Sequence, residues 1–494
     1  MGIHRFYSGV VKPILKYRKT LDAKTKPDIL CIDLNGVIHL IAAHRLPKKA
    51  RDDEKMRLSC INNILKFTNK VIEYVAPKKV IIAIDGIAPF AKINQQRKRR
   101  LVQSSSRSTY DTNAITAGTA FMSELSSIFE DYCSKKGIDF SGVDQKGEGE
   151  HKIMAYLRET KDLDKKNVVV MGDDSDLYML LLTVNTKDCY VFRSDDVISS
   201  KRREPEHTDF NYYRVGDFDD YLNRVLPGID GRSFFIVMSM FMGNDFIPAM
   251  RCFDSDFNKL YEQAFTHRKN ITKGSEIDFS EVAGVLSNID EVGLFREKLS
   301  DLSIEFPILT ANAKITKEHV DDMYGDVVGF DLHRFRNQWY ARMFPHLGPD
   351  DIVPEDFVRQ VVFDYLTQIQ WTYSYYMGED VSQETHYRHT FAPLLQDVVK
   401  YGPTLKITTP RETTVEQNMY TNLLCVLPRR DVDLLPDEIK HLMSPGSLLC
   451  DMFPYEASVY KDGYKQDYMY THMFPIPDLK RVSYIVSNAV KKKK

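Results

Sequence analysis

The chain has 494 residues with a formal net charge of −2; 43% of the residues are hydrophobic and 28% are charged. This length is too great for one ordinary hydrophobic core, so we expect two or more structural units. The composition is typical of a soluble globular protein. Because the net charge is close to zero, any binding of a polyanion requires a local basic patch.

Cysteine use and hydropathy bear on where the protein works. The seven cysteines are scattered and form no CxxC pair. They argue against a disulfide framework or a zinc module and indicate a reducing compartment, for which we expect the cytoplasm, with the nucleus as the alternative. No apolar run approaches the roughly 18 residues of a membrane span, so we expect no membrane partner. Lys491–Lys494 is interpreted as a solvated tail, with a nuclear signal as the alternative.

Three apolar, β-branched runs each lead into acidic residues. They are Ile29–Ile32 before Asp33, Val80–Ile84 before Asp85, and Val168–Gly172 before Asp173, Asp174 and Asp176. Continuous apolar runs of this kind predict buried parallel strands. Helical patterns at Cys60–Tyr74 and Thr119–Cys133 lie between them. The sequence therefore predicts an α/β fold, a parallel sheet flanked by helices, which binds its ligand where the strands end.

Seven acidic residues form a candidate catalytic and metal-binding set: Asp33, Asp85, Glu148, Glu150, Asp174, Asp176 and Asp245. Residues two apart do not share a helix face, so Glu148 and Glu150 are expected at the entrance of a helix, and Asp174 and Asp176 on an extended strand exit. Converging carboxylates repel one another unless hard cations bind them, which favours Mg²⁺, with Mn²⁺ or Ca²⁺ as alternatives. Two such ions about 4 Å apart can drive phosphodiester cleavage. For any single Asp, a helix cap is the more common role.

A basic helix is predicted directly after Asp85, over Ala88–Leu101. On a helix, Lys92, Gln96, Arg99 and Arg100 would share one face, and no acidic residue occurs from Lys92 to Tyr110. Such a face suits a terminal phosphate, and a solvated surface helix is the alternative. His39 follows Asp33 closely; a structural role and stacking on a base are equally compatible with its position.

A polar segment at His267–Ser275 marks the expected domain boundary. We predict a catalytic nuclease domain over residues 1–268, a mostly helical second region over 269–490, and a basic tail over 491–494.

At these residues the sequence resembles the Xrn family of 5′→3′ exoribonucleases. The resemblance in the first region rests on Asp33–His39, Asp85–Pro89 with Lys92–Arg100, Ile115–Thr119, Gly147–Met154, Gly172–Leu177 and Met242–Pro248. In the second region it rests on Gln370-Trp371 with Tyr373, Tyr375 and Tyr376, then Ala392-Pro393, Val426–Pro428, Leu434–Pro436, Leu442–Pro445 and Pro475–Asp478. The resemblance covers nearly the whole chain. The chain is similar to a compact catalytic core of the family without further C-terminal domains.

The resemblance implies a PIN/flap-nuclease-like sheet capped by the second region, which restricts entry to single strands. It implies that the seven carboxylates bind metal, that Lys92, Gln96, Arg99 and Arg100 hold a 5′-monophosphate, and that His39 stacks on the first base. The implied activity is processive, two-metal-ion hydrolysis of single-stranded RNA from a 5′-monophosphate end, releasing nucleoside 5′-monophosphates during RNA decay. A monomer acting after a decapping activity is the expected setting.

One departure from the family concerns base stacking. Members usually carry two Trp shortly before the Ala-Pro pair, whereas Val381–Phe391 has none, and His386 or Tyr387 is the candidate replacement. Two other functions compete with the exoribonuclease. A structure-specific flap or 5′ DNA nuclease shares the acidic set but needs neither the second region nor the basic face. An inactive RNA-binding relative would have lost acidic residues, and all seven are present.

Overall fold

The computed structural model describes residues 10, 14, 26–45, 53–105, 111–193, 212–253, 257–292, 294, 332–341, 343, 352–415, 417–455, 457–460 and 470–491. Within these residues, no helix combines the length and the apolar character that crossing a bilayer requires.

A six-stranded sheet organises the first region, in the order β3-β2-β1-β4-β5-β6. The strands are β1 Ile29–Asp33, β2 Lys79–Ala83, β3 Asp139–Ser141, β4 Asn167–Met171, β5 Asp188–Phe192 and β6 Tyr213–Arg214. The first five are mutually parallel, and β6 pairs antiparallel with β5. The three apolar runs expected as strands are confirmed as β2, β1 and β4. Because these are neighbours, their carboxyl ends meet at one edge of the sheet.

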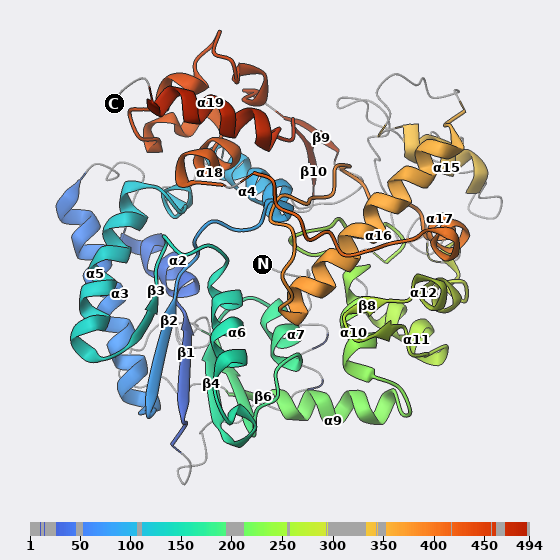
Figure 1. Cartoon of the computed structure of the whole chain (residues 1–494), viewed down its shortest axis with the longest axis horizontal. Coiled ribbons are helices and arrows are strands. Elements are labelled where there is room, and N and C mark those ends of the chain that lie inside the picture. The colour runs from blue at the N-terminus through green and yellow to red at the C-terminus, as the bar shows by residue number, and fades with distance from the viewer. Residues whose placement is uncertain are drawn as a thin grey trace.

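Hydrophobic clusters cover both faces of this sheet. On β1, Ile29 and Cys31 pack into one cluster and Leu30 and Ile32 into another, because successive strand side chains point to opposite faces. The second of these clusters includes residues of α2 (Leu34–Arg45), α3 (Glu54–Val75) and α5 (Ala120–Lys136). The first includes residues of α6 (Gly149–Glu159), α7 (Asp176–Leu182), α9 (Val215–Val225) and α10 (Gly231–Met240). Figure 1 shows these two helix layers on either side of the strands.

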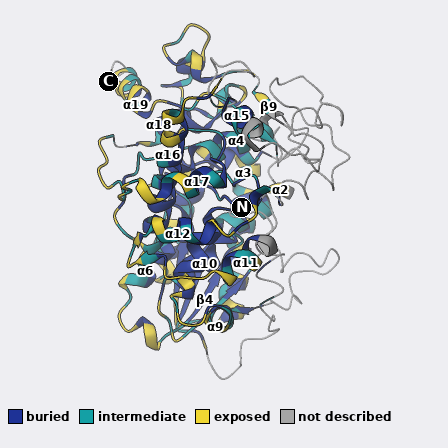
Figure 2. Cartoon of the chain, turned by 90° about the vertical axis from the view of Figure 1, so that its right-hand side faces the viewer, coloured by how far each residue is buried: buried dark blue, intermediate teal, exposed yellow. Residues whose placement is uncertain are grey.

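Local signals explain where the helices begin and end. The side chain of Asp53 caps α3 and that of Thr119 caps α5, each accepting a hydrogen bond from a backbone N–H of the first turn. The helical patterns expected at Cys60–Tyr74 and Thr119–Cys133 are confirmed within these two helices. In α10 every residue except Arg232 is buried, and Figure 2 shows this helix in the interior.

The second region is mostly helical, as expected. Its helices are α12 (Phe279–Leu286), α15 (Leu332–Ala341), α16 (Glu355–Met377), α17 (Leu395–Tyr401), α18 (Met419–Val426) and α19 (Leu479–Lys491). β7 (Thr272–Lys273) pairs antiparallel with β8 (Glu276–Ile277), and β9 (Ser458–Tyr460) pairs antiparallel with β10 (Thr471–Met473). In Figure 1, α16 runs from α15 down to α6 and α7.

The expected boundary at residues 268/269 falls between α11 (Phe257–Thr266) and β7. Side chains from both sides of it share one hydrophobic cluster, with Cys31 of β1 and Trp371 of α16 among its members. The division into two domains therefore stays a prediction, with a common core across the boundary. Lys491 is the last residue of α19, and the rest of the predicted tail, residues 492–494, lies outside the described part.

Candidate active site

Six of the seven predicted carboxylates end or follow strands or open helices at the carboxyl edge of the sheet or close to it, and the seventh, Asp245, follows a helix. Asp33 ends β1, Asp85 follows β2, Asp174 follows β4, Glu148 and Glu150 open α6, Asp176 opens α7, and Asp245 follows α10. Electrostatic interactions link them. Asp33 interacts with Asp85 and Asp174, Glu150 with Asp174 and Glu148, and Asp176 with Asp245. The structure thus brings the whole set together, as the strand-end argument predicted.

The entrance of α6 brings two carboxylates into the cluster. Glu148 is the extended residue before the helix (φ −80°, ψ 152°), and Glu150 lies in the first turn, which confirms the predicted helix entrance. Between them, the backbone N–H of Gly149 donates to Asp85 Oδ1 at 2.7 Å. A Cβ on Gly149 would lie 2.8 Å from Asp33 Oδ1, so a larger residue here would push the chain away from β1.

The expectation that Asp176 lies on an extended strand exit was wrong. Asp174 lies in the irregular segment after β4, but the backbone at Ser175 already has helical angles (φ −69°, ψ −28°), and Asp176 is the first residue of α7. The two acids therefore do not share an extended segment. A carboxylate in the first turn of a helix is favourable because the unpaired N–H groups there carry partial positive charge.

Burial and mutual repulsion perturb these carboxyl groups. Asp33, Glu148, Glu150, Asp176 and Asp245 are each at most 7% exposed. Burial raises the pKa of Glu148 to about 7 and that of Asp176 to about 6, with Asp245 adding repulsion on Asp176. Burial and neighbouring carboxylates also raise the pKa values of Asp33 and Glu150. These four carboxyl groups, Asp33, Glu148, Glu150 and Asp176, therefore resist ionisation unless positive charge is supplied.

Lys92 supplies part of that charge, which corrects its predicted placement on an open face with Gln96, Arg99 and Arg100. It ends the short helix η3 (Phe90–Lys92) and is only 7% exposed. Its ammonium group is ion-paired with Glu148 and lies 2.8 Å from Asp245 Oδ2. Burial opposes the charged form, but these two carboxylates raise the pKa of Lys92. Lys92 thus lies inside the carboxylate cluster.

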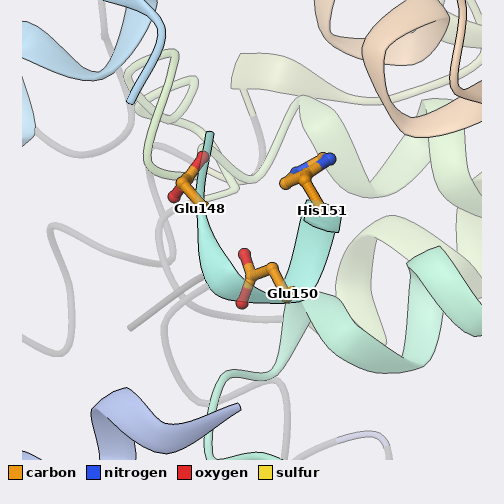
Figure 3. A group of neighbouring side chains, drawn as sticks. All are labelled: Glu148, Glu150 and His151. Carbon is orange, nitrogen blue, oxygen red and sulfur yellow. The ribbon is translucent and has the colours of Figure 1, made fainter. Parts of the chain in front are cut away.

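The donor set also fits divalent cations. Glu148 Oε2 is buried without a hydrogen-bond partner, as is Nε2 of His151. Glu148, Glu150 and His151 each offer one donor atom within 4.8 Å of the others, and Figure 3 shows the three side chains around the start of α6. Buried oxygen donors without protein partners, in a cluster of carboxylates, are what hard cations bind.

The predicted basic face begins one turn beyond Lys92, on α4 (Ile93–Ser105), where Gln96, Arg99 and Arg100 are each partly exposed. Arg100 Nε donates to Thr116 Oγ1 at 3.0 Å. Burial lowers the pKa of Arg100 to about 9, and the neighbouring Arg99 adds to this effect. These two guanidinium groups therefore form a concentrated positive site beside the cluster.

A further basic residue of this helix, Arg97, has a structural role. Arg97 is 7% exposed and donates to the carbonyl oxygens of Cys425 at 2.7 Å and Met452 at 2.6 Å. It therefore ties α4 to the second region, where the helix packs against α18. The second region thus fixes the position of the basic face.

His39 lies in α2, next to both parts of the site. Burial, together with Arg99 and Arg100, lowers the pKa of His39 to about 3, while Asp174 acts in the opposite direction. His39 thus carries a neutral imidazole that interacts with both Asp174 and the two arginines, and its stacking on a base stays a prediction. Two residues were candidates for a second ring that stacks on the other side of the base. Tyr387 is 1% exposed and donates its hydroxyl to the carbonyl oxygen of Phe391. His386 is partly exposed and packs edge-on against Phe90.

Sequence reasoning missed four residues at the site, His151, Lys152, Tyr375 and Tyr376. Tyr376 donates its hydroxyl to Asp176 Oδ2 at 2.7 Å, and Tyr375 stacks on His151 with ring centroids 3.9 Å apart. Lys152 donates to the carbonyl oxygens that follow β2 and β3, at 2.9 and 2.7 Å. His151 and Lys152 fall inside the stretch Gly147–Met154, and the tyrosines inside the aromatic run of the second region, so the resemblance marked the segments without indicating these roles.

Two solved structures share weak similarity with the chain. The catalytic core of Rad2 in complex with DNA matches at a TM-score of 0.39 and 15% identity, covering 76% of this chain and 97% of that chain. A bacteriophage T5 D15 flap endonuclease matches at a TM-score of 0.30 and 15% identity, covering 56% of this chain and 92% of that chain. The family assignment rests on the sequence matches alone.

Those sequence matches span both regions. The family model of the XRN 5′-3′ exonuclease N-terminus matches residues 1–195, and that of the Xrn1 helical domain matches residues 303–492. Human 5′-3′ exoribonuclease 1 is 26% identical over 98% of this chain and 34% of its own length. The Saccharomyces cerevisiae 5′-3′ exoribonuclease 1 is 22% identical over 85% of this chain and 33% of its own, and Kluyveromyces lactis 5′-3′ exoribonuclease 2 is 26% identical over 52% and 34%. The chain spans about a third of the length of these relatives. With both conserved regions matched in order, the chain belongs to the Xrn family.

Proposed function

We propose that this protein is a processive 5′→3′ exoribonuclease that hydrolyses single-stranded RNA from a 5′-monophosphate end and releases nucleoside 5′-monophosphates. The observation that carries the proposal is the direct adjacency of two sites. A buried carboxylate cluster with unpartnered donor atoms lies beside the partly exposed Arg99 and Arg100. An enzyme that cuts next to a terminal phosphate needs both sites, one step of the RNA backbone apart.

The seven carboxylates would hold two divalent cations, Mg²⁺ or Mn²⁺. Such cations lower the pKa of bound water and stabilise the charge that develops on the phosphodiester. Arg99 and Arg100 would bind the terminal phosphate by charge-assisted hydrogen bonds. Gln96, on the same partly exposed face of α4, would add an uncharged donor. Lys92 would respond to the cations. Its ammonium is paired with Glu148 and Asp245, and it would turn toward the scissile phosphate when cations take over these carboxylates.

Stacking would provide the grip that processivity requires. His39 carries a neutral imidazole near the basic face. A base held on that ring, with His386 as the candidate second wall, would stay bound while the new 5′ end moves into the phosphate site. Stacking on an aromatic ring contributes about 1–3 kcal/mol per base and tolerates any sequence.

The cellular setting follows from the same chemistry. A 5′-monophosphate end arises when a cap is hydrolysed, so a decapping activity would supply the substrate. All seven cysteines are free thiols, which suits the reducing cytoplasm or nucleus. We propose that the enzyme acts as a monomer.

The test compares matched RNAs that differ only in their 5′ end: monophosphate, triphosphate, hydroxyl or cap. We expect rapid loss of the monophosphate RNA with Mg²⁺, little loss of the other three, and none with EDTA. Equal decay of all four RNAs would contradict the phosphate site. Cleavage confined to branched or flapped DNA would instead support the flap-nuclease alternative.

A further inference from the structure

We infer that Tyr376, in the second region, is a positioning residue for the metal-binding carboxylate Asp176, and that Arg158 holds Tyr376 in place. The inference rests on the proposed function, because it treats Asp176 as a cation ligand. It deepens that function by assigning part of the catalytic geometry to a helix outside the nuclease sheet.

The contact between the two residues is direct and buried. Tyr376 Oη donates to Asp176 Oδ2 at 2.7 Å, and the two residues are 1% and 4% exposed. A carboxylate that binds a cation through one oxygen can still rotate about its last side-chain bond. The hydroxyl of Tyr376 limits that rotation by holding Oδ2.

The backbone of Tyr376 is itself clamped by the opposite end of α6. Arg158 Nη2 donates to the carbonyl oxygen of Tyr376 at 2.6 Å and to Thr183 Oγ1 at 2.8 Å. The next residue but one, Gly378, ends α16 in the left-handed region (φ +81°), and a Cβ there would lie 2.4 Å from Arg158 Nη1. The arginine therefore needs a glycine at this position to reach the carbonyl.

The end of α16 contacts the cluster at two further points. Tyr375 stacks on His151, the residue after Glu150, at 3.9 Å. Phe246, the residue after Asp245, packs edge-on against Tyr375 at 5.8 Å. One helix end of the second region thus touches Asp176 and the neighbours of two other carboxylates. Figure 1 shows this end of α16 arriving at α6 and α7.

Hydrogen-bond partners that orient metal ligands typically change metal affinity or activity by about 10–100-fold when they are removed. The test is therefore metal binding itself, measured without RNA. Mn²⁺ is titrated into the full chain, and free Mn²⁺ is counted by electron paramagnetic resonance. We expect Tyr376→Phe to weaken at least one Mn²⁺ dissociation constant by about 10–100-fold.

Tyr373→Phe is the matched control. Tyr373 lies one turn earlier in α16, is equally buried, and donates its hydroxyl to Ser233 at 2.8 Å, away from the carboxylates. It should lose thermal stability much as Tyr376→Phe does and keep the wild-type Mn²⁺ constants. In an Asp176→Asn background, Tyr376→Phe should have no further effect on Mn²⁺ binding.

Three results would overturn the inference: wild-type Mn²⁺ constants in Tyr376→Phe, equal weakening in Tyr373→Phe, or an undiminished effect in the Asp176→Asn background. Failure of the proposed function is a separate result. It would appear as a wild-type protein that binds Mn²⁺ but degrades no RNA.

Discussion

Replacing Lys92 by Met should destabilise the metal-free protein more than the metal-bound one. The substitution keeps most of the side-chain volume and removes the ammonium group that neutralises Glu148 and Asp245. At an effective dielectric constant of about 20, the 2.8 Å pair with Asp245 alone corresponds to about 6 kcal/mol of attraction. Met avoids the desolvation cost of the ammonium, so the net loss should be about 3–5 kcal/mol, the usual cost of removing one partner of a buried ion pair.

Cations should compensate for this loss, because they supply the missing positive charge. The assay is urea unfolding of wild type and Lys92→Met, in EDTA and in saturating Mg²⁺. The stabilisation by Mg²⁺ should be larger in the variant, since the cation no longer competes with the ammonium. Lys135→Met is the control: Lys135 pairs with Asp131 at 2.6 Å, but both side chains are exposed, and such pairs contribute at most about 1 kcal/mol. Equal unfolding midpoints for wild type and Lys92→Met in EDTA would refute the reasoning.

The remaining predictions concern ligation, end recognition, stacking and pH. Asp174→Ala should remove RNA degradation while the protein stays folded, and near wild-type turnover in saturating Mg²⁺ would contradict the ligand assignment. Arg99→Ala should cost about 1.5–3 kcal/mol in kcat/KM on 5′-phosphorylated RNA, with little effect on 5′-hydroxyl RNA; an equal effect on both would place the phosphate site elsewhere. His39→Ala should release longer partial products in a single-encounter decay assay with a heparin trap, and unchanged fragment lengths would assign the grip to other groups. The folded pKa values of Glu148 and Asp176 are about 7 and about 6, and both exceed the unfolded values. The protonated forms therefore stabilise the folded protein, and this contribution to the free energy of unfolding is fully present below about pH 4. It is lost as the pH rises through 6 and 7. In EDTA the urea midpoint should therefore fall over this range, Mg²⁺ should reduce the fall, and a midpoint that rises with pH in EDTA would contradict the burial of these acids.

The strands and the carboxylate set could be predicted because both depend on local patterns. A buried parallel strand needs a continuous apolar run, and β1, β2 and β4 each have one. Parallel neighbours end at one edge, so acids that follow these strands had to converge. The positions of Asp33 and Asp85 at this edge could therefore be predicted without knowledge of the packing.

The errors arose where local rules compete. A spacing of two residues suggested one extended segment for Asp174 and Asp176, but the chain turns into a helix at Ser175. Helical spacing likewise placed Lys92 with Arg99 and Arg100. Their burial differs because Lys92, at the end of η3, extends its ammonium group into the carboxylate cluster. Helical periodicity predicts which side chains share a face, but it does not predict how deeply each is buried.

The contact of Tyr376 with the carboxylate cluster could not be predicted from local sequence patterns. Its partner Asp176 is 200 positions away in the sequence, and a tyrosine in an aromatic helix is usually a core residue. Only the packing of α16 on α6 and α7 brings the hydroxyl to the carboxylate. The same holds for Arg97, whose two carbonyl partners lie more than 300 positions away.

The central claim concerns the end from which RNA is degraded, and the position of a label tests it most directly. A single-stranded RNA with a 5′-monophosphate is labelled either in its first or in its last nucleotide, and release of label is followed with Mg²⁺ present. We predict that the 5′ label appears at once as nucleoside 5′-monophosphate, while the 3′ label stays in long RNA until each molecule is nearly consumed. Earlier release of the 3′ label, or internal fragments carrying either label, would contradict a 5′→3′ exoribonuclease.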